Sequence, residues 1–247
     1  MEITQEPPLS PDFFYKKKVI VYQGKKGYRF SVDAPILADF LPTCQNQSAL
    51  DIGTGCGIVS LLALYRKKFA SIHGIEIQET LTRYARLNAE HNHFADTFNI
   101  INGDFNKLHY QFKGLSHIFS NPPFYEVHRG RLSPNPEIRI AKTETALTLY
   151  QLLSRTYSIL GNPGNLYIIL PHTRYSDIMN LITRIPYRIS RQRLIFSFKD
   201  GKPERFLVQL TNYDVSSVTL EPLIIFKEKG VYTEEMDRIL TGSNTDD

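Results

Sequence analysis

The sequence is poor in cysteine and in patterns that bind a metal. Its two cysteines, Cys44 and Cys56, cannot form a disulfide framework, and neither a Cys-x-x-Cys nor a His-x-Glu pattern occurs. The seven histidines are scattered along the chain. These absences exclude a disulfide scaffold and give no support for a zinc site, so we expect a protein that needs no metal.

Long hydrophobic runs are also missing. The chain has no stretch of about 18 apolar residues and no basic-then-apolar leader before Asp12. We therefore expect neither a membrane span nor a signal peptide, and a cytoplasmic location. With 42% hydrophobic and 22% charged residues, the composition is that of a globular protein. The length of 247 residues suits a single α/β domain with an extension.

A strong excess of charge of one sign is absent as well, because the formal net charge is only +4. Basic residues nevertheless alternate with aromatic ones in four segments, and we expect the first three to flank the functional site. Segments of this kind are suited to contact RNA phosphates, although each one alone is as often a solvated surface. They cover residues 15–18, 25–29, 128–131 and 187–193.

A glycine-rich turn stands out among the features that are present. An apolar run at residues 48–52 predicts a buried strand, Gly53-Thr54-Gly55-Cys56-Gly57 follows, and residues 58–64 predict a helix. Glycine lets the main chain lie against a ligand, and a helix start favours a carboxylate or phosphate. The third glycine comes one place early for the dinucleotide pattern Gly-x-Gly-x-x-Gly, and position 58 is Ile. The spacing therefore argues against a nicotinamide oxidoreductase.

Three more apolar runs end in polar residues. Glu76 follows one of them, where its carboxylate could accept both hydroxyls of a ribose. Asp104 ends the next and is suited to hold an adenine amine, with Phe105 beside it; Asn121 follows the last. A single acidic residue after a strand is usually a helix cap or a solvated charge. The glycine turn, Glu76, Asp104 and Asn121 follow four strands in this order, and together they predict one ligand site instead.

Asn121-Pro122-Pro123-Phe124 predicts a rigid corner that grips a planar amine. The lone pair of such an amine is shared with its π system. We expect the Asn121 side-chain oxygen and the Pro122 carbonyl to accept its N–H bonds, so that the lone pair points outward. Phe124 would stack on the target ring, a contact worth about 1–3 kcal/mol per base. Taken alone, Asn-Pro-Pro is more often only a turn. The irregular residues 125–144 are expected to form a substrate lid.

Elsewhere, predicted strands and helices alternate, which favours a parallel sheet. Residues 1–12 are expected to be a mobile arm and residues 18–31 a hairpin. Asp33 is expected to cap a helix that ends at Pro42. Further predicted helices cover residues 80–91, 145–160 and 173–184, and further strands cover residues 166–170, 188–198 and 205–213, the last two flanking an Asp-Gly turn.

The motifs within residues 48–125 resemble those of the class I methyltransferases that depend on S-adenosylmethionine, in the branch whose fourth motif is Asn-Pro-Pro-aromatic. Within that branch the chain is similar to the bacterial tRNA(Val) adenine-N6 methyltransferase family, which modifies the adenine immediately 3′ of the anticodon. Residues 30–34 resemble that family's Thr-Asp-Ala segment, and residues 232–236 resemble its ending. Residues 139–144 resemble its Ile-Ala-Arg-His-Glu element, with Lys142-Thr143 in place of Arg-His.

The resemblance implies a Rossmann-like α/β fold, with a mostly parallel seven-stranded sheet and an antiparallel C-terminal hairpin. Residues 1–45 would be a small N-terminal extension over the cofactor site, and residues 46–247 the methyltransferase core. Catalysis would fall to Asn121, Pro122 and Phe124 on an adenine flipped into the pocket, position 37 of tRNA(Val). The partner would be the anticodon stem-loop, bound by a monomer. S-adenosylmethionine would be held by Asp33, Asp51, Gly53, Thr54, Gly55, Gly57, Glu76, Ile77, Asp104, Phe105 and Asn121.

Other interpretations stay open at this point. The same corner can orient the amide of a protein glutamine or the N2 amine of a ribosomal RNA guanine, and Phe124 in place of tyrosine does not decide between them. The basic, aromatic-rich flanks favour RNA. A non-catalytic RNA-binding module is the alternative from another class of protein. Methyl transfer onto tRNA, ribosomal RNA and protein, tested separately, discriminates among all of these.

Overall fold

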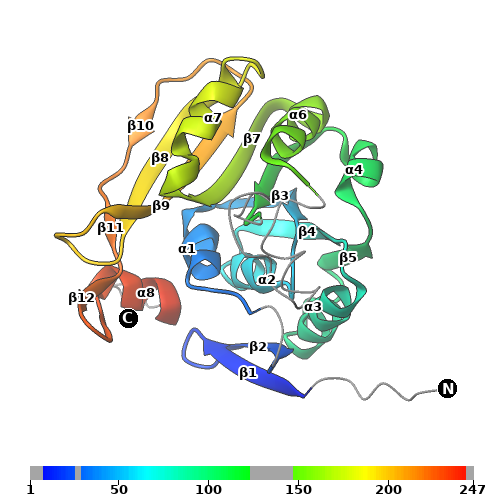
Figure 1. The fold of residues 1–247 in the computed structure, drawn as a ribbon. Coiled ribbons are helices and arrows are strands. Elements are labelled where there is room, and N and C mark those ends of the chain that lie inside the picture. Colours follow the sequence, from blue (N-terminus) through cyan, green and yellow to red (C-terminus); the bar gives the residue numbers. More distant parts are fainter. Residues whose placement is uncertain (1–7, 26–28, 123–146, 243–247) are drawn as a thin grey trace, which may run out of the picture.

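The computed structural model of the protein describes residues 8–25, 29–122 and 147–242. A mostly parallel sheet lies at its centre (Figure 1). Within the described residues, seven main strands follow the order β8-β9-β7-β6-β3-β4-β5, and two short strands, β10 and β11, extend the sheet beyond β8. The strands are β3 (Cys44–Ile52), β4 (Phe69–Glu76), β5 (Phe98–Asn102), β6 (Leu115–Ser120), β7 (Leu160–Pro171), β8 (Arg188–Phe196), β9 (Pro203–Thr211), β10 (Val218–Thr219) and β11 (Leu223–Ile224).

The strand directions divide this sheet into two parts. The strands from β7 to β5 are parallel to their neighbours, whereas β9 is antiparallel to both β7 and β8. The predicted architecture, a parallel sheet with an antiparallel C-terminal pair, is confirmed. The seven predicted strands correspond to the seven main strands, and the short strands β10 and β11 are additional.

Each face of the sheet has its own hydrophobic cluster. Alternation along a strand divides the side chains between them, so that Ala49 joins the first cluster and Leu50 the second. The first cluster is covered by α1 (Asp33–Phe40), α2 (Ile58–Tyr65), α3 (Glu79–His91) and α8 (Glu234–Thr241). The second is covered by α4 (Phe105–Leu108), η1 (His109–Phe112), α6 (Leu149–Ile159) and α7 (Tyr175–Ile182), which follows η2 (His172–Arg174).

Local sequence explains where these helices begin and end. The Thr148 hydroxyl accepts a hydrogen bond from the Gln151 N–H, and the Gln151 side chain accepts from the Thr148 N–H, so α6 begins later than predicted. This reciprocal pair is a capping box. The helix that Pro42 was expected to end does stop at Phe40. The expected cap is wrong, because Val32 occupies the N-cap position and Asp33 is already the first helical residue.

The N-terminal hairpin is not where the sequence predicted it. β1 (Leu9–Phe14) pairs with β2 (Val19–Gly24) around a turn at residues 15–18. The hairpin expected over residues 18–31 is therefore wrong, and residues 9–12, expected in a mobile arm, belong to a strand. Gly24 and Gly27 looked like the turn, but the chain turns at Tyr15 to Lys17 without any glycine. The division of the chain at residue 45 stays a prediction.

Asn88 of α3 and Asn92, the residue that caps the end of this helix, attach the hairpin to the rest of the fold. Asn88 accepts from the Tyr22 N–H and donates to the Tyr22 carbonyl, at 2.7 and 2.9 Å. Asn92 makes the same pair of bonds with Ile20, at 2.9 and 2.7 Å. These side chains satisfy the backbone groups of the hairpin edge that faces the helix, so β2 is held along α3.

The C-terminal segment adds a second small hairpin and the last helix. Phe226–Glu228 (β12) and Val231–Tyr232 (β13) form a second small hairpin before α8. Within the described residues, no helix is long and apolar enough to cross a membrane, and no group of three or more His, Cys, Asp and Glu could hold a metal ion. The expected lid at residues 125–144 and Phe124 lie outside the described residues.

Candidate active site

The polar strand ends predicted from sequence come together at the carboxyl edge of the sheet. β3 lies between β4 and β6, and Ile52 of β3 is opposite both Ile75 and Ser120. The Ser120 hydroxyl donates to the Ile52 carbonyl at 2.8 Å, which ties the two strand ends together. Glu76 and Asn121 therefore flank the glycine turn from opposite sides, at the edge where open α/β sheets bind ligands.

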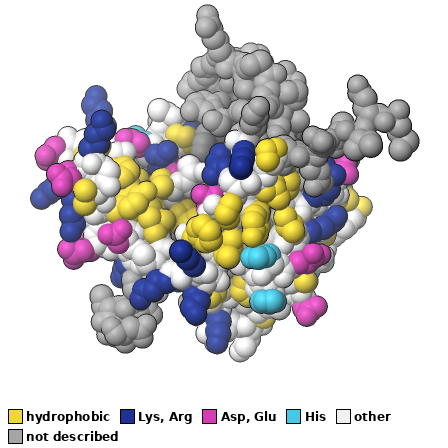
Figure 2. Space-filling view, turned by 90° about the horizontal axis from the view of Figure 1, so that it is seen from below, with side chains coloured by type: hydrophobic (Ala, Val, Ile, Leu, Met, Phe, Trp, Pro, Cys, Tyr) yellow, Lys and Arg dark blue, Asp and Glu magenta, His cyan; other side chains and the backbone are white. Residues whose placement is uncertain are grey.

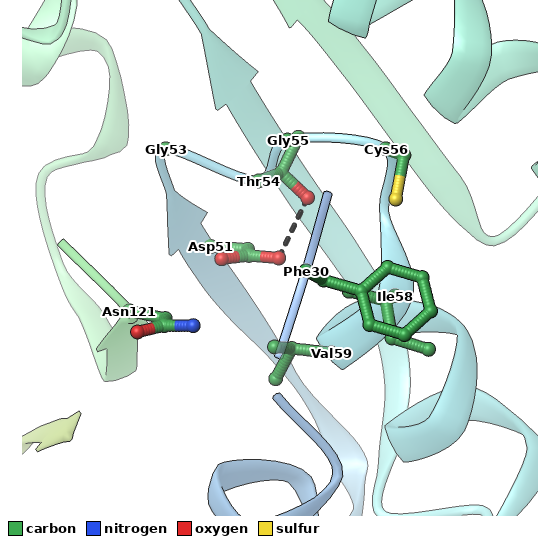
Figure 3. Close-up of a pocket in the computed structure, with 9 residues that line it drawn as sticks. All are labelled: Phe30, Asp51, Gly53, Thr54, Gly55, Cys56, Ile58, Val59 and Asn121. Atoms are coloured by element: carbon green, nitrogen blue, oxygen red, sulfur yellow. Dashed lines mark hydrogen bonds between the residues drawn. The ribbon is translucent and has the colours of Figure 1, made fainter. Parts of the chain in front are cut away.

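A pocket of about 350 Å³, open space included, lies at this edge (Figure 3). Figure 3 shows the Asp51 carboxylate between Asn121 on one side and the Phe30 ring on the other. The turn after β3 forms its rim, and the first residues of α2 line it as well. The lining residues are Phe30, Asp51, Gly53, Thr54, Gly55, Cys56, Ile58, Val59 and Asn121.

The three glycines of the turn serve two different purposes. All three have positive φ, +70° at Gly53, +60° at Gly55 and +88° at Gly57. A Cβ on Gly53 or Gly55 would meet nothing within 4 Å, whereas one on Gly57 would lie 2.8 Å from the Phe98 ring. Gly53 and Gly55 thus leave open space beside the pocket for a ligand, and Gly57 allows close packing of α2 against β5.

Asp51 is a buried carboxylate with one oxygen fully engaged. The Thr54 and Ser60 hydroxyls both donate to Oδ2 at 2.6 Å. Burial raises the pKa of Asp51 to about 7, although these two hydrogen bonds act in the opposite direction. The other oxygen, Oδ1, makes no hydrogen bond to any described residue. It can accept an N–H from a cationic ligand, which would also stabilise the charged form of the carboxylate.

Glu76 supports the glycine turn from behind. Its Oε2 accepts from the Gly55 N–H at 3.0 Å and its Oε1 from the Gln78 N–H at 2.9 Å. Burial raises its pKa, partly offset by these backbone hydrogen bonds. Glu76 is not among the residues that line the pocket, and its expected contact with a ribose stays a prediction.

Asn121 has a buried acceptor without a donor. Its Oδ1 makes no hydrogen bond to any described residue, although the atom is buried. An unsatisfied buried carbonyl costs about 1–3 kcal/mol, so an N–H donor brought by a ligand would be favoured here. The next residue, Pro122, is buried and supplies a carbonyl but no donor. Asn121 lines the pocket, and the joint grip of an amine by Asn121 and the Pro122 carbonyl stays a prediction.

The remaining predicted residues lie outside this pocket. Asp104 caps α4 by accepting from the Asn106 N–H at 2.9 Å, and Phe105 is buried behind it. Ile77 is 43% exposed. Asp33 is buried and forms an ion pair with Arg205 of β9. Their contacts with a cofactor stay predictions, and for Asp33 the ion pair already supplies a structural reason for the carboxylate.

Several residues at the site were not predicted from the sequence. Ser60 lies nine positions after Asp51 yet hydrogen-bonds to it. The spacing of a residue one helical turn into α2 could have suggested this contact, because that face of the helix points back to the strand end. Phe30 lines the pocket from the loop before α1, and no local pattern indicates that contact.

Comparisons with known proteins agree with this geometry. Residues 29–185 match the profile of the family Methyltransferase small domain. The chain is 31% identical to a tRNA1(Val) (adenine(37)-N6)-methyltransferase of Porphyromonas gingivalis, over 78% of each chain. It is 24% identical to one from Flavobacteriaceae bacterium strain 3519-10, over 90% of this chain and 94% of that protein.

The solved structures that resemble the chain share its fold. A predicted O-methyltransferase of Agrobacterium tumefaciens has a TM-score of 0.64 at 17% identity, with 85% of this chain and 96% of that chain covered. A SAM-dependent methyltransferase of Aquifex aeolicus has a TM-score of 0.54 at 13% identity, with 73% and 90% covered.

Fold, pocket and comparisons define the class of this protein as a class I methyltransferase with a Rossmann-like sheet. The chain belongs to the Methyltransferase small domain family and, within it, to the family of the tRNA1(Val) (adenine(37)-N6)-methyltransferases. The predicted family and the predicted reaction class, methyl transfer from S-adenosylmethionine, are confirmed.

Proposed function

We propose that this protein transfers a methyl group from S-adenosylmethionine to N6 of an adenine in tRNA, at position 37 of tRNA(Val). The relatives carry this activity in their names, and the pocket supplies the chemistry. The observation that carries the proposal is the unsatisfied Asn121 oxygen, which lies in the same pocket as the glycine turn and Asp51. The same proposal includes recognition of the anticodon stem-loop, action as a monomer and a cytoplasmic location.

Two features of the pocket suit S-adenosylmethionine, namely open space beside the glycine turn and a carboxylate. Gly53 and Gly55 leave room where a side chain would intrude. Asp51 offers a free carboxylate oxygen to a ligand with a net positive charge, and the half-buried Phe30 ring lies on the other side of the pocket. When bound, this cofactor supplies a methyl group on a sulfonium, which needs only a nitrogen lone pair as its acceptor.

Asn121 and Pro122 would prepare that lone pair. The amine of adenine shares its lone pair with the ring and is a weak nucleophile. Two acceptors against its N–H bonds, the Asn121 side chain and the Pro122 carbonyl, favour the geometry in which the lone pair points outward. They also hold the nitrogen in place, and this orientation lowers part of the activation barrier of methyl transfer. After alkylation the nitrogen proton is acidic and leaves to water, so no general base is required.

A methyl-transfer assay on separate acceptors tests the proposal. The protein is incubated with labelled S-adenosylmethionine and unmodified tRNA, ribosomal RNA or protein, and digested RNA is analysed for N6-methyladenosine. We expect label in tRNA, in that nucleoside, at position 37 of tRNA(Val). Label in a ribosomal RNA guanine or in protein glutamine would overturn the assignment of the acceptor, and no transfer to any of them would overturn methylation itself.

Replacing Asn121 by alanine tests the mechanism. Removing one such polar group from an active site typically lowers kcat by about 10²–10³-fold, so Asn121→Ala should lose turnover to this extent and keep its affinity for the cofactor. Asn99→Ala is a matched control, because Asn99 is exposed on β5 of the same sheet. Turnover retained in Asn121→Ala would remove Asn121 from the mechanism.

A further inference from the structure

The turn of the N-terminal hairpin has an unusual backbone. We call residues Tyr15 to Lys18 the lysine turn. Its first three residues have positive φ, 51° at Tyr15, 54° at Lys16 and 67° at Lys17. Residues other than glycine rarely adopt this conformation, and then usually one at a time. A run of three persists only where the surrounding structure holds it in place.

The end of α8 and the end of α2 provide that support. The Tyr15 N–H donates to the Leu240 carbonyl at 3.1 Å, and the Tyr15 ring is only 3% exposed and stacks on Tyr65 at 5.1 Å. Gly242, just after α8, has no room for a side chain, because a Cβ there would lie 2.5 Å from the Tyr15 ring. Figure 1 shows the hairpin turn beside α8. The turn is therefore a supported part of the fold.

This backbone presents a group of unpaired positive charges. Lys16, Lys17 and Lys18 are all exposed, and Lys67 is exposed just after Arg66. None of these lysines forms an ion pair with a described carboxylate, whereas Arg66, next to Lys67, is paired with Asp39. In Figure 2, dark blue Lys and Arg side chains gather beside a broad yellow hydrophobic area on this side of the molecule. The group is suited to bind a polyanion.

The lysine turn lies away from the pocket. α2 lines the pocket with Ile58 at its start and contacts Tyr15 through Tyr65 at its end. The opposite end of the hairpin is near the pocket, since the Asn88 amide bridges the carbonyls of Tyr22 and Cys56. Residues 15–18, which were expected to flank the site, are therefore not among the residues that line the pocket. From Lys18 at the end of the turn to Tyr22 beside Cys56 there are four steps of about 3.4 Å along the strand, or roughly 14 Å.

That separation identifies the part of a substrate that would reach the turn. An RNA stem is an A-form duplex that advances about 2.8 Å per base pair, so this span matches roughly five base pairs. We propose that the lysine turn binds phosphates of the tRNA substrate at the far end of the anticodon stem or beyond, while the target base occupies the pocket. This inference rests on the proposed function and adds a second, remote contact to it.

A charge-removal variant tests the contact. Lys16→Gln/Lys17→Gln/Lys18→Gln is compared with wild type on full-length tRNA and on an RNA hairpin that keeps the anticodon loop but has half the stem. On full-length tRNA, the slope of log Kd against log salt should fall by about 2–3. At moderate salt, kcat/KM on the same RNA should fall about tenfold through KM. The short hairpin should be methylated equally well by both proteins.

Two controls make the result specific. Lys113→Gln/Arg184→Gln/Lys229→Gln removes the same net charge from scattered exposed positions and should have little effect. Lys16→Arg/Lys17→Arg/Lys18→Arg should behave like wild type. Unchanged kcat/KM on full-length tRNA, an equal loss on both RNAs, or an equal loss in the scattered variant would each overturn the inference. The proposed function fails separately, if wild type methylates neither RNA.

Discussion

Two turns of this chain use the same rare backbone conformation in different ways. The turn after β3 has positive φ at Gly53, Gly55 and Gly57, and the lysine turn has it at Tyr15, Lys16 and Lys17. In the first, the missing side chains of Gly53 and Gly55 leave open space beside the pocket. In the second, residues with full side chains adopt the left-handed backbone although it disfavours them, and the side chains of its three lysines are exposed to solvent. A left-handed turn can thus make either a cavity or a charged projection, depending on its side chains.

The two turns also differ in what they are suited to bind. The glycine turn lies beside Asp51, a buried carboxylate, and so favours a cationic ligand. The lysine turn is exposed and positive, and so favours phosphates. α2 connects them, with the glycine turn before its first residue and the Tyr15 contact at its last. A cofactor and a long RNA can therefore bind at the two ends of one helix without competing.

The largest effect on stability is expected within the glycine turn. Gly57→Ala combines a left-handed backbone, which costs about 1–2 kcal/mol, with a Cβ 2.8 Å from Phe98, where overpacking costs about 1–3 kcal/mol. The free energy of unfolding, measured by urea denaturation, should fall by roughly 2–5 kcal/mol in total. Gly53→Ala has only the backbone cost and should lose about half as much. Equal losses at both positions would contradict the division of roles.

The charge of Asp51 provides the next test. Its pKa is raised to about 7 by burial, so below pH 7 the free protein must lose a proton before the carboxylate can bind a cation. The Kd for S-adenosylmethionine, measured by calorimetry, should rise up to tenfold per pH unit below 7 and level off above it. Asp51→Asn should bind more weakly and lose most of this dependence. A flat wild-type profile would contradict the assignment.

The same raised pKa affects folding stability with a definite sign. The folded protein holds the Asp51 proton more tightly than the unfolded chain, whose value is near 3.8. The stability that this group contributes is therefore complete below about pH 4 and is lost as pH rises towards 7. Burial also raises the pKa of Glu76, which contributes with the same sign, so Asp51→Asn is needed to separate the two.

The sequence predicted the parts of this protein that depend on local order along the chain. The glycine turn, Glu76 and Asn121 each follow an apolar strand, and parallel strands bring their carboxyl ends to one edge. The sheet then places Asp51 and Asn121 in one pocket. The reaction class follows from this set because few other chemistries need a cation-binding cradle beside a pair of acceptors for an amine.

The parts that were missed depend on contacts between distant segments. Asp33 pairs with Arg205 on β9, and no pattern near Asp33 reveals that partner. The hairpin was misplaced because glycines are the usual signal of a turn, whereas this one is held by Leu240 and Tyr65 from other elements. Tertiary support overrode local preference, and the lysines of this turn are not among the residues that line the pocket.

The smallest expected effect sharpens the comparison most, because it should improve one property and weaken another. Lys16→Gly removes the cost of a left-handed side chain, about 1–2 kcal/mol, but glycine is more flexible in the unfolded chain, which offsets about 0.5–1 kcal/mol. The free energy of unfolding should rise by roughly 0.5–1 kcal/mol. The slope of log Kd against log salt for full-length tRNA should fall by about 1.

A neighbouring substitution separates backbone from side chain. Lys17 has the same left-handed backbone, with φ of 67°, but its ammonium also lies 5.7 Å from the Phe13 ring centroid. An exposed contact of this kind is worth about 0.5–1 kcal/mol, so Lys17→Gly should gain little or no stability. Its slope of log Kd against log salt for full-length tRNA should fall as much as that of Lys16→Gly. If Lys16→Gly failed to stabilise the fold, the turn would not be under backbone strain. If it stabilised the fold without weakening tRNA binding, the lysines would have to be retained for some other reason.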